Sequence, residues 1–185
     1  MPAGSEARAG LRWPAIVVVA LLVVLVGAVT GWAQATPAAT STAEADDTVT
    51  LSSLTGSVTV DPIPGWQVTD RSEEQLRLTH RGDTVSVTAL AVGTPPGSLS
   101  TMFQRRARRL TLGDIAATQQ QSRRTRHGYR GLDGTAVGHG MIGRLTVLRR
   151  GDRAVSVLVL AAPSRLAGYE PQLDRLYDSI SGAAA

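Results

Sequence analysis

Hydrophobic residues alternate with polar ones along most of the chain from Val49 onward. The runs 49–51 and 58–60 lie on either side of Thr55-Gly56. Such alternation predicts strands with one face on a core, and the intervening glycine predicts a hairpin. Further runs of the same kind follow at 66–68, 76–78, 85–91, 115–126, 131–142, 144–150 and 153–162. Short turns join these runs, and strands joined in this way pair antiparallel.

Two segments change to a helical period. After Pro-Pro-Gly, Ser98 or Ser100 can cap a helix whose apolar face is formed by Leu99, Met102, Phe103, Ala107 and Leu110. Arg106 falls within that face, and we expect its side chain to extend past the core edge rather than pair with a buried acid. A closing helix begins near Pro171, and its apolar face is formed by Tyr169, Leu173, Leu176, Tyr177 and Ile180. The pattern predicts an α+β fold, an antiparallel sheet flanked by helices, in one domain over residues 48–181.

The N-terminal part of the chain has a different pattern. Pro14–Gly31 carries no charge, and at ~1.5 Å per residue it is about 27 Å long, close to the hydrocarbon core of a bilayer. Trp13 and Trp32 bracket this segment, and Arg8 and Arg12 precede it. These features predict a transmembrane anchor over 14–32, with residues 1–13 in the cytoplasm and the remainder exported.

The same N-terminal segment can also be interpreted as a cleaved signal peptide. Ala33-Gln34-Ala35 matches the small-residue site of signal peptidase, which would cut after Ala35 and release the protein. Either interpretation places the folded domain outside the cytoplasm. Residues 33–47 are rich in Ala, Thr, Ser and Pro, without apolar periodicity, and are predicted to form a flexible linker.

Charge is concentrated in the middle of the chain, although the net charge is only +4. Every basic residue is arginine, and eight arginines lie between Thr101 and Gly131, against one acid, Asp114. The candidate patch for an anionic partner consists of Arg105, Arg108, Arg109, Arg123, Arg124 and Arg126. Because the domain is exported, lipid headgroups or wall polymers are the expected partners rather than nucleic acid. The arginines can equally be ordinary solvated surface residues of a chain without lysine.

No motif in the sequence predicts catalysis, a metal site or a cofactor. The chain has no cysteine, which excludes thiol nucleophiles and disulfides. Gly138–Gly143 spells G-x-G-x-x-G, but an alternating strand pattern follows where a nucleotide site needs a helix, so these glycines are interpreted as a hairpin. Three histidines, His80, His127 and His139, match no metal-binding spacing, and the nearby Asp83 and Asp133 are predicted at turns. Both Arg-Gly-Asp tripeptides are likewise interpreted as turns.

The stretch "VTVDPIPGWQV", a strand followed by a Pro-x-Pro-Gly-Trp turn, resembles the opening of PsbP/Mog1-like domains of bacterial envelope proteins. The helix 102–110, the glycines of 131–134, Met141, the strand "AVSVLVLAAP" and the closing "LDRLYDSI" are similar to later features of that family. The resemblance implies an antiparallel sheet between helices that serves as a binding or assembly module without catalytic residues. Pro64, Gly65 and Trp66 are expected to be structural, with Trp66 in the core.

These features together predict a single-pass bacterial membrane protein with its N-terminus inside, whose ectodomain is a non-catalytic binding or scaffolding module of the cell envelope. A spanning helix would replace the lipid anchor of relatives that carry a lipobox cysteine. Three alternatives remain. One is a secreted enzyme or metal-binding protein cleaved after Ala35. Another is an accessory protein of a type VII secretion locus, which also resembles the chain. The third is an arginine-rich binder of anionic lipid or wall polymer.

Overall fold

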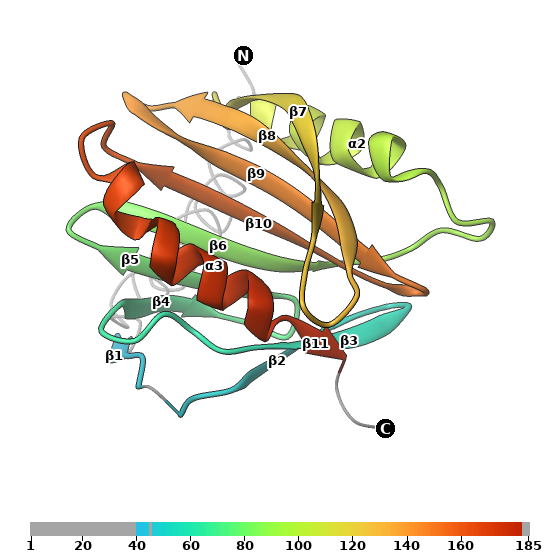
Figure 1. Cartoon of the computed structure of the whole chain (residues 1–185), viewed down its shortest axis with the longest axis horizontal. Helices are drawn as coiled ribbons and strands as arrows, with labels where there is room; N and C mark the ends of the chain where they lie inside the picture. Colours follow the sequence, from blue (N-terminus) through green and yellow to red (C-terminus); the bar gives the residue numbers. More distant parts are fainter. Residues whose placement is uncertain (1–39, 45, 183–185) are drawn as a thin grey trace, which may run out of the picture. The chain divides into compact units, whose positions relative to one another are not determined.

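The computed structural model describes residues 40–44 and 46–182. The main layer of this folded domain is an eight-stranded antiparallel sheet (Figure 1). Its strands, in spatial order, are β1 (Ser41–Thr42), β4 (Gln67–Arg71), β5 (Gln75–His80), β6 (Asp83–Leu90), β10 (Arg153–Ala161), β9 (Met141–Arg150), β8 (Arg130–Gly138) and β7 (Ala116–Arg124). Most neighbours in this order are also neighbours in sequence, which agrees with the short turns between the alternating runs. The antiparallel sheet is therefore confirmed.

The two helices cover opposite faces of this sheet. Helix α2 (Leu99–Thr111) packs over β7, β8 and β9, and α3 (Glu170–Ser179), preceded by the 3-10 turn η1 (Leu166–Tyr169), lies across the other face (Figure 1). A hydrophobic core lies on each face of the sheet, and successive side chains of β10 point into them alternately. Val157 packs in the core beneath α3, whereas Leu158 packs in the core beneath α2. We refer below to the α2 face and the α3 face of the sheet.

A smaller sheet, which the sequence did not predict as a separate unit, completes the core beneath α3. It consists of β2 (Val49–Ser53), β3 (Gly56–Val60) and β11 (Ser181–Gly182), with β3 in the centre. The hairpin predicted at Thr55-Gly56 joins β2 to β3. Leu51 and Val58 are buried in the same cluster as α3. The last strand follows α3 directly, so both ends of this helix are tied to sheets.

The domain begins earlier than the predicted boundary at residue 48. Ser41 and Thr42 of the predicted linker form β1 on the edge of β4, and Ala43 is 3% exposed. The Ala43 N–H donates a hydrogen bond to the Trp66 carbonyl, and the Ala43 carbonyl accepts one from the Gly65 N–H. The predicted anchor 14–32 and the cleavage-site residues Ala33 and Ala35 lie outside the described residues. Among the described residues, no helix is long and apolar enough to cross a membrane.

The Pro-Ile-Pro-Gly-Trp turn places Trp66 in the core, as predicted. Gly65 has φ +80, a conformation that favours glycine, and the chain then enters β4. The Trp66 side chain is 2% exposed, and its ring centroid lies 5.2 Å from that of Tyr169. Its indole N–H donates to Gln172 Oε1 of α3 at 3.3 Å. Trp66 therefore joins the edge of the main sheet to the start of α3.

Candidate functional site

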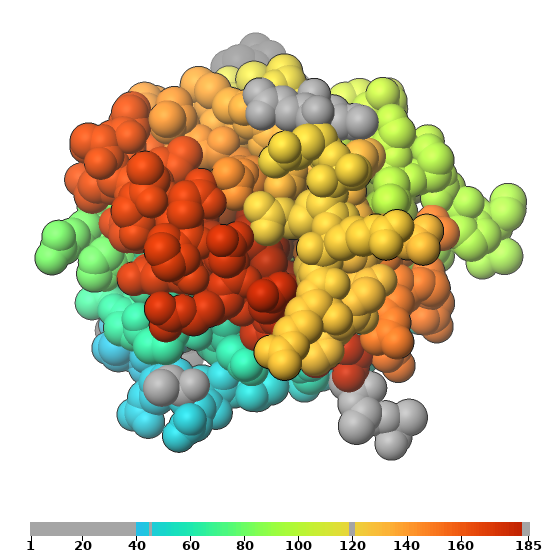
Figure 2. All heavy atoms as spheres, in the orientation of Figure 1, coloured from blue at the N-terminus to red at the C-terminus, as the bar shows by residue number. Residues whose placement is uncertain are grey.

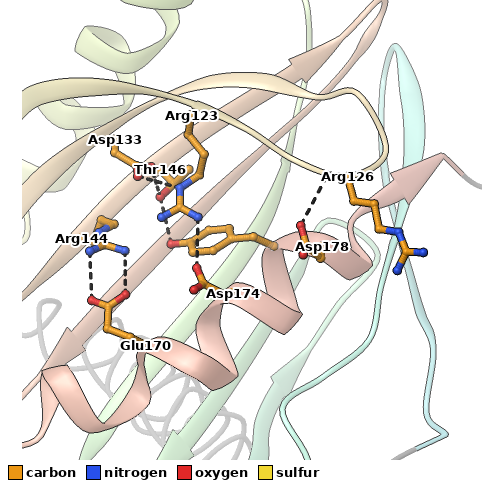
Figure 3. A network of polar contacts seen from close by, with 9 residues as sticks. Arg123, Arg126, Asp133, Arg144, Thr146, Glu170, Asp174 and Asp178 are labelled. Carbon is orange, nitrogen blue, oxygen red and sulfur yellow. Dashed lines mark hydrogen bonds and ion pairs between the residues drawn. The ribbon is translucent and has the colours of Figure 1, made fainter.

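Leu173, Leu176 and Tyr177 of α3 are buried against the sheet, and beside them the helix carries a more exposed row of acidic residues with a spacing of four, namely Glu170, Asp174 and Asp178. Figure 3 shows that each one points toward a partner on β9, β7 or the turn after β7. Arg144 donates two hydrogen bonds to Glu170, of 3.0 and 3.2 Å. Arg123 approaches Asp174 at 3.4 Å, and the backbone N–H of Arg126 donates to Asp178. The acidic row therefore fixes α3 along the β7–β9 side of the sheet.

A buried group of polar side chains lies beneath this row. Asp133, in the middle of β8, is 2% exposed and accepts hydrogen bonds of 2.7 Å from Arg123 Nε and from the hydroxyl of Thr146. Thr146 also contacts the Tyr177 hydroxyl of α3 at 2.9 Å. Burial raises the pKa of Tyr177 to about 12. The prediction that Asp133 lies at a turn is wrong, because the Asp-Gly pair that suggested a turn is inside a strand.

Burial alone would lower the pKa of Arg123, but its hydrogen bond to Asp133 and the charge of that carboxylate raise the pKa overall. The guanidinium also lies 4.3 Å from the ring centroid of Tyr177. The Arg123 guanidinium therefore makes its contacts inside the domain, with Asp133, Asp174 and Tyr177.

A second buried carboxylate, Asp83, is also part of the scaffold. It is 1% exposed and begins β6, so the prediction of a turn residue is wrong here as well. Arg165 donates to both of its oxygens at 2.6 and 2.7 Å, and the Tyr169 hydroxyl and the Ala162 N–H also donate. The hydrogen bonds from Arg165, opposed by burial, lower the pKa of Asp83 to about 2. This carboxylate joins β6 to the segment between β10 and α3.

Each of these groups is held by contacts inside the domain. Asp83 and Asp133 are enclosed by their partners. His80 stacks on Trp66, with ring centroids 5.4 Å apart, and His139 contacts the carbonyl oxygen of Gly113. No group of three or more potential metal ligands occurs in residues 40–44 and 46–182. The hydrogen bonds of Asp133 and Asp83 hold α3, and the segment that precedes it, against the sheet.

The outer face of α2 is different. Arg105, Arg108 and Arg109 are exposed on it, and the helix contains no acidic residue. None of the four ion pairs among the described residues involves α2. Like-signed side chains are thus gathered on one helix without an acidic partner within ion-pair distance.

Arg106 reaches from α2 to the neighbouring strand β6. It is half-buried and donates to the Thr88 hydroxyl at 3.2 Å, and no acid among the described residues forms an ion pair with it. Burial, and then the charge of Arg109, lower the pKa of Arg106. Beside it lies a hollow of about 160 Å³ lined by Leu90, Ala91, Met102, Arg105, Arg106 and Arg109.

The structure does not bring the six predicted patch arginines together. Arg123 points to the α3 face, and Arg126 lies in the turn after β7, where its backbone contacts Asp178 (Figure 3). Arg124 is the strand neighbour of Arg123 and therefore lies on the α2 face, with the arginines of α2. Alternation along β7 thus divides a cluster that is continuous in sequence.

The α3 face is hollowed where α3 approaches the Pro-Ile-Pro turn. Figure 2 shows this side, with α3 and the β7–β8 hairpin next to each other. A hollow of about 380 Å³ lies between Pro62–Pro64 and α3, and Arg175 lines it. Arg175 also lines a neighbouring hollow of about 570 Å³ with Arg126, His127 and Asp178. Both signs of charge line this second hollow, so it has no clear preference for an anion.

The acidic row of α3 was not predicted from the sequence, and the predicted patch left out Arg149 and also Arg130, which is one of the eight arginines between Thr101 and Gly131. The four-residue spacing of the acids was visible on a predicted helix and was a usable signal. The two arginines join the α2 face only through strand pairing, which the sequence does not state.

Comparison with known proteins gives a fold relationship. No family model matches the chain, and no curated protein matches it. Among solved structures, the cyanobacterial PsbP (CyanoP) from Synechocystis sp. PCC 6803 aligns with a TM-score of 0.52 at 13% identity. The alignment covers 73% of this chain and 92% of that chain. The described domain therefore has a PsbP-like fold.

Proposed function

We propose that the chain is a membrane-tethered, non-catalytic binding module of the bacterial cell envelope, and that its anionic partner contacts the α2 face. The observation that carries this proposal is the exposure of Arg105, Arg108 and Arg109 on a helix without acidic residues. Elsewhere in the domain, arginines such as Arg123 and Arg144 have carboxylate partners. Arg105, Arg108 and Arg109 are exposed and can meet a carboxylate or phosphate from outside.

Electrostatics supports a role in association rather than in folding. Clustered cations attract an anionic partner over distances of about the Debye length, ~8–10 Å at physiological salt. A guanidinium forms bidentate hydrogen bonds with carboxylate and phosphate groups, which adds specificity to the attraction. The hollow beside Arg106 supplies a partly desolvated position where such bonds are stronger than on the open surface.

The proposed tether is the apolar segment 14–32, joined to β1 by the eight residues 33–40. A flexible segment of that length spans roughly 15 Å on average. The domain would thus remain beside the membrane that anchors it. Sequencing of the mature N-terminus tests this part, and a sequence beginning at Thr36 would show release instead of anchoring.

The α2 face can be tested with the full chain in nonionic detergent on a phosphocellulose matrix. We expect the triple variant Arg105→Gln/Arg108→Gln/Arg109→Gln to elute at lower salt than a matched control. The control, Arg71→Gln/Arg77→Gln/Arg175→Gln, removes the same charge from exposed arginines outside the α2 helix. Elution of the two triple variants at the same salt concentration would refute an anion-binding role for α2.

A further inference from the structure

Three arginines stand side by side across the ends of three neighbouring strands. In the strand register, Arg124 of β7 lies opposite Arg130 of β8, and Arg130 lies opposite Arg149 of β9. We call these three residues the arginine row. Neighbouring strands are about 4.8 Å apart, so the row is roughly 10 Å long. Residues that are far apart in the sequence thereby form one line of positive charge.

The row lies on the α2 face. Arg149 has the same parity along β9 as Leu145 and Val147, which pack against α2. Arg124 and Arg130 are exposed, and none of the ion pairs among the described residues involves the row. Arg149 donates a hydrogen bond to the Gly97 carbonyl at 2.7 Å.

This arrangement is unfavourable for the isolated domain. Directly opposite side chains have Cβ atoms about 4.5–5.5 Å apart, and like charges at that distance destabilise a sheet. Arg130 has an arginine on each side. Packing does not require the charge at an exposed position, because a neutral side chain of similar length would fit equally well. A bound polyanion removes the repulsion and gains a charge-assisted bond from each guanidinium.

The same line of strand partners leads toward the hollow beside α2. Arg149 lies opposite Ala154, and Ala154 lies opposite Leu90, which lines that hollow. Arg105, Arg106 and Arg109 line it as well. Positive charge is thus present at both ends of one line across the sheet, and this geometry fits an extended chain of anions.

We propose that the arginine row binds a linear polyanion with closely spaced phosphate groups, and this inference rests on the proposed function because the row shares the α2 face. Phosphate fits best because each guanidinium can hold two of its oxygens. A lipid surface fits less well, because interfacial elements insert apolar side chains. The exposed large hydrophobics of the described residues are Leu54, Leu112 and Val137, none of which adjoins the row in its strands.

The test uses the full chain in nonionic detergent, with linear inorganic polyphosphate as the probe and the melting temperature as the readout. The double variant Arg124→Gln/Arg130→Gln removes the row but leaves Arg149 and its loop contact in place. Arg71→Gln/Arg77→Gln is the matched control on β4 and β5. We expect polyphosphate to raise the melting temperature of the wild type and of the control. In the double variant, the concentration for half of the maximal shift should rise about tenfold or more.

Other outcomes would overturn the inference. If the double variant needs the same polyphosphate concentration as the wild type for half of the maximal melting-temperature shift, the arginine row does not bind polyphosphate. An equal response to orthophosphate at the same phosphate concentration would exclude a linear ligand. Binding to phosphatidylglycerol vesicles without binding to polyphosphate would replace the polymer with a membrane surface. The two proposals also separate, since the elution test changes only α2 and this test changes only the row.

Discussion

The two faces of the sheet use charge in opposite ways. On the α3 face, each acidic residue of the helix has a partner on the sheet or in the adjoining turn, and Asp133 and Asp83 are enclosed by donors. On the α2 face, the helix and the strand ends carry arginines that have no carboxylate partner among the described residues. Paired charges position an element, whereas unpaired charges of one sign destabilise the domain slightly and attract a partner. The paired charges explain how the α3 face is held together, and the unpaired ones are the basis for proposing that the α2 face binds a partner.

Removal of Asp133 should give the largest effect on the α3 face. In Asp133→Ala, the half-buried guanidinium of Arg123 and the hydroxyl of Thr146 lose their acceptor. Breaking a buried charged pair from one side costs about 3–5 kcal/mol. Urea unfolding at pH 7 measures the change. The exposed Glu74→Ala is the control and should stay within about 0.5 kcal/mol of the wild type. Equal costs for the two variants would contradict the structural role of Asp133.

Asp83 makes the α3 face sensitive to acid. Its pKa is lowered from 3.8 to about 2 in the folded state. A lowered folded pKa stabilises the protein above pH 3.8, and the contribution fades as the pH falls through about 2. The contribution at neutral pH is about 2 kcal/mol.

Unfolding measured from pH 5 to pH 2 tests this linkage with Asp83→Asn, which lacks the titrating carboxyl. The variant should be less stable at pH 5 and should lose less stability over the acid range than the wild type. Asp174→Asn is the matched control, because that side chain is 63% exposed. An identical acid profile for Asp83→Asn and the wild type would show that another carboxyl dominates.

The Arg144–Glu170 pair should contribute a smaller amount. It is bidentate, but its side chains are 25% and 39% exposed, so we expect a coupling of about 0.5–1 kcal/mol. A double-mutant cycle with Arg144→Gln and Glu170→Gln measures it. The same cycle with Arg108→Gln in place of Arg144→Gln should give no coupling, because Arg108 lies on the helix of the other face. Coupling of similar size in both cycles would remove the distinction between the faces.

Local patterns predicted the fold better than they predicted the charge networks. Alternation gave the strands, and the Ser98 cap and apolar spacing gave the helix at Leu99–Thr111, because these signals act over a few residues. Asp83 and Asp133 have turn-like neighbours in sequence, yet Asp83 is buried by Arg165, 82 positions away. Burial of a carboxylate depends on such distant donors and on strand register. The division of the arginines between faces depends on the same register.

Arg130→Gln should produce the smallest effect, but its sign is informative. Arg130 lies between two arginines in the strand register, whereas Arg77 of β5 lies opposite Asp70 of β4. At low salt, Arg130→Gln should stabilise the domain by about 0.2–1 kcal/mol, and Arg77→Gln should destabilise it by a similar amount.

Both effects should shrink toward zero at about 1 M salt, where the Debye length is roughly 3 Å. Chemical unfolding in urea, which is uncharged, measures both variants at low and at high sodium chloride. A loss of stability in Arg130→Gln at low salt would mean that Arg130 has a stabilising role within the domain. In that case the α2 face would use its charge as the α3 face does, and the row would need no external anion to account for it.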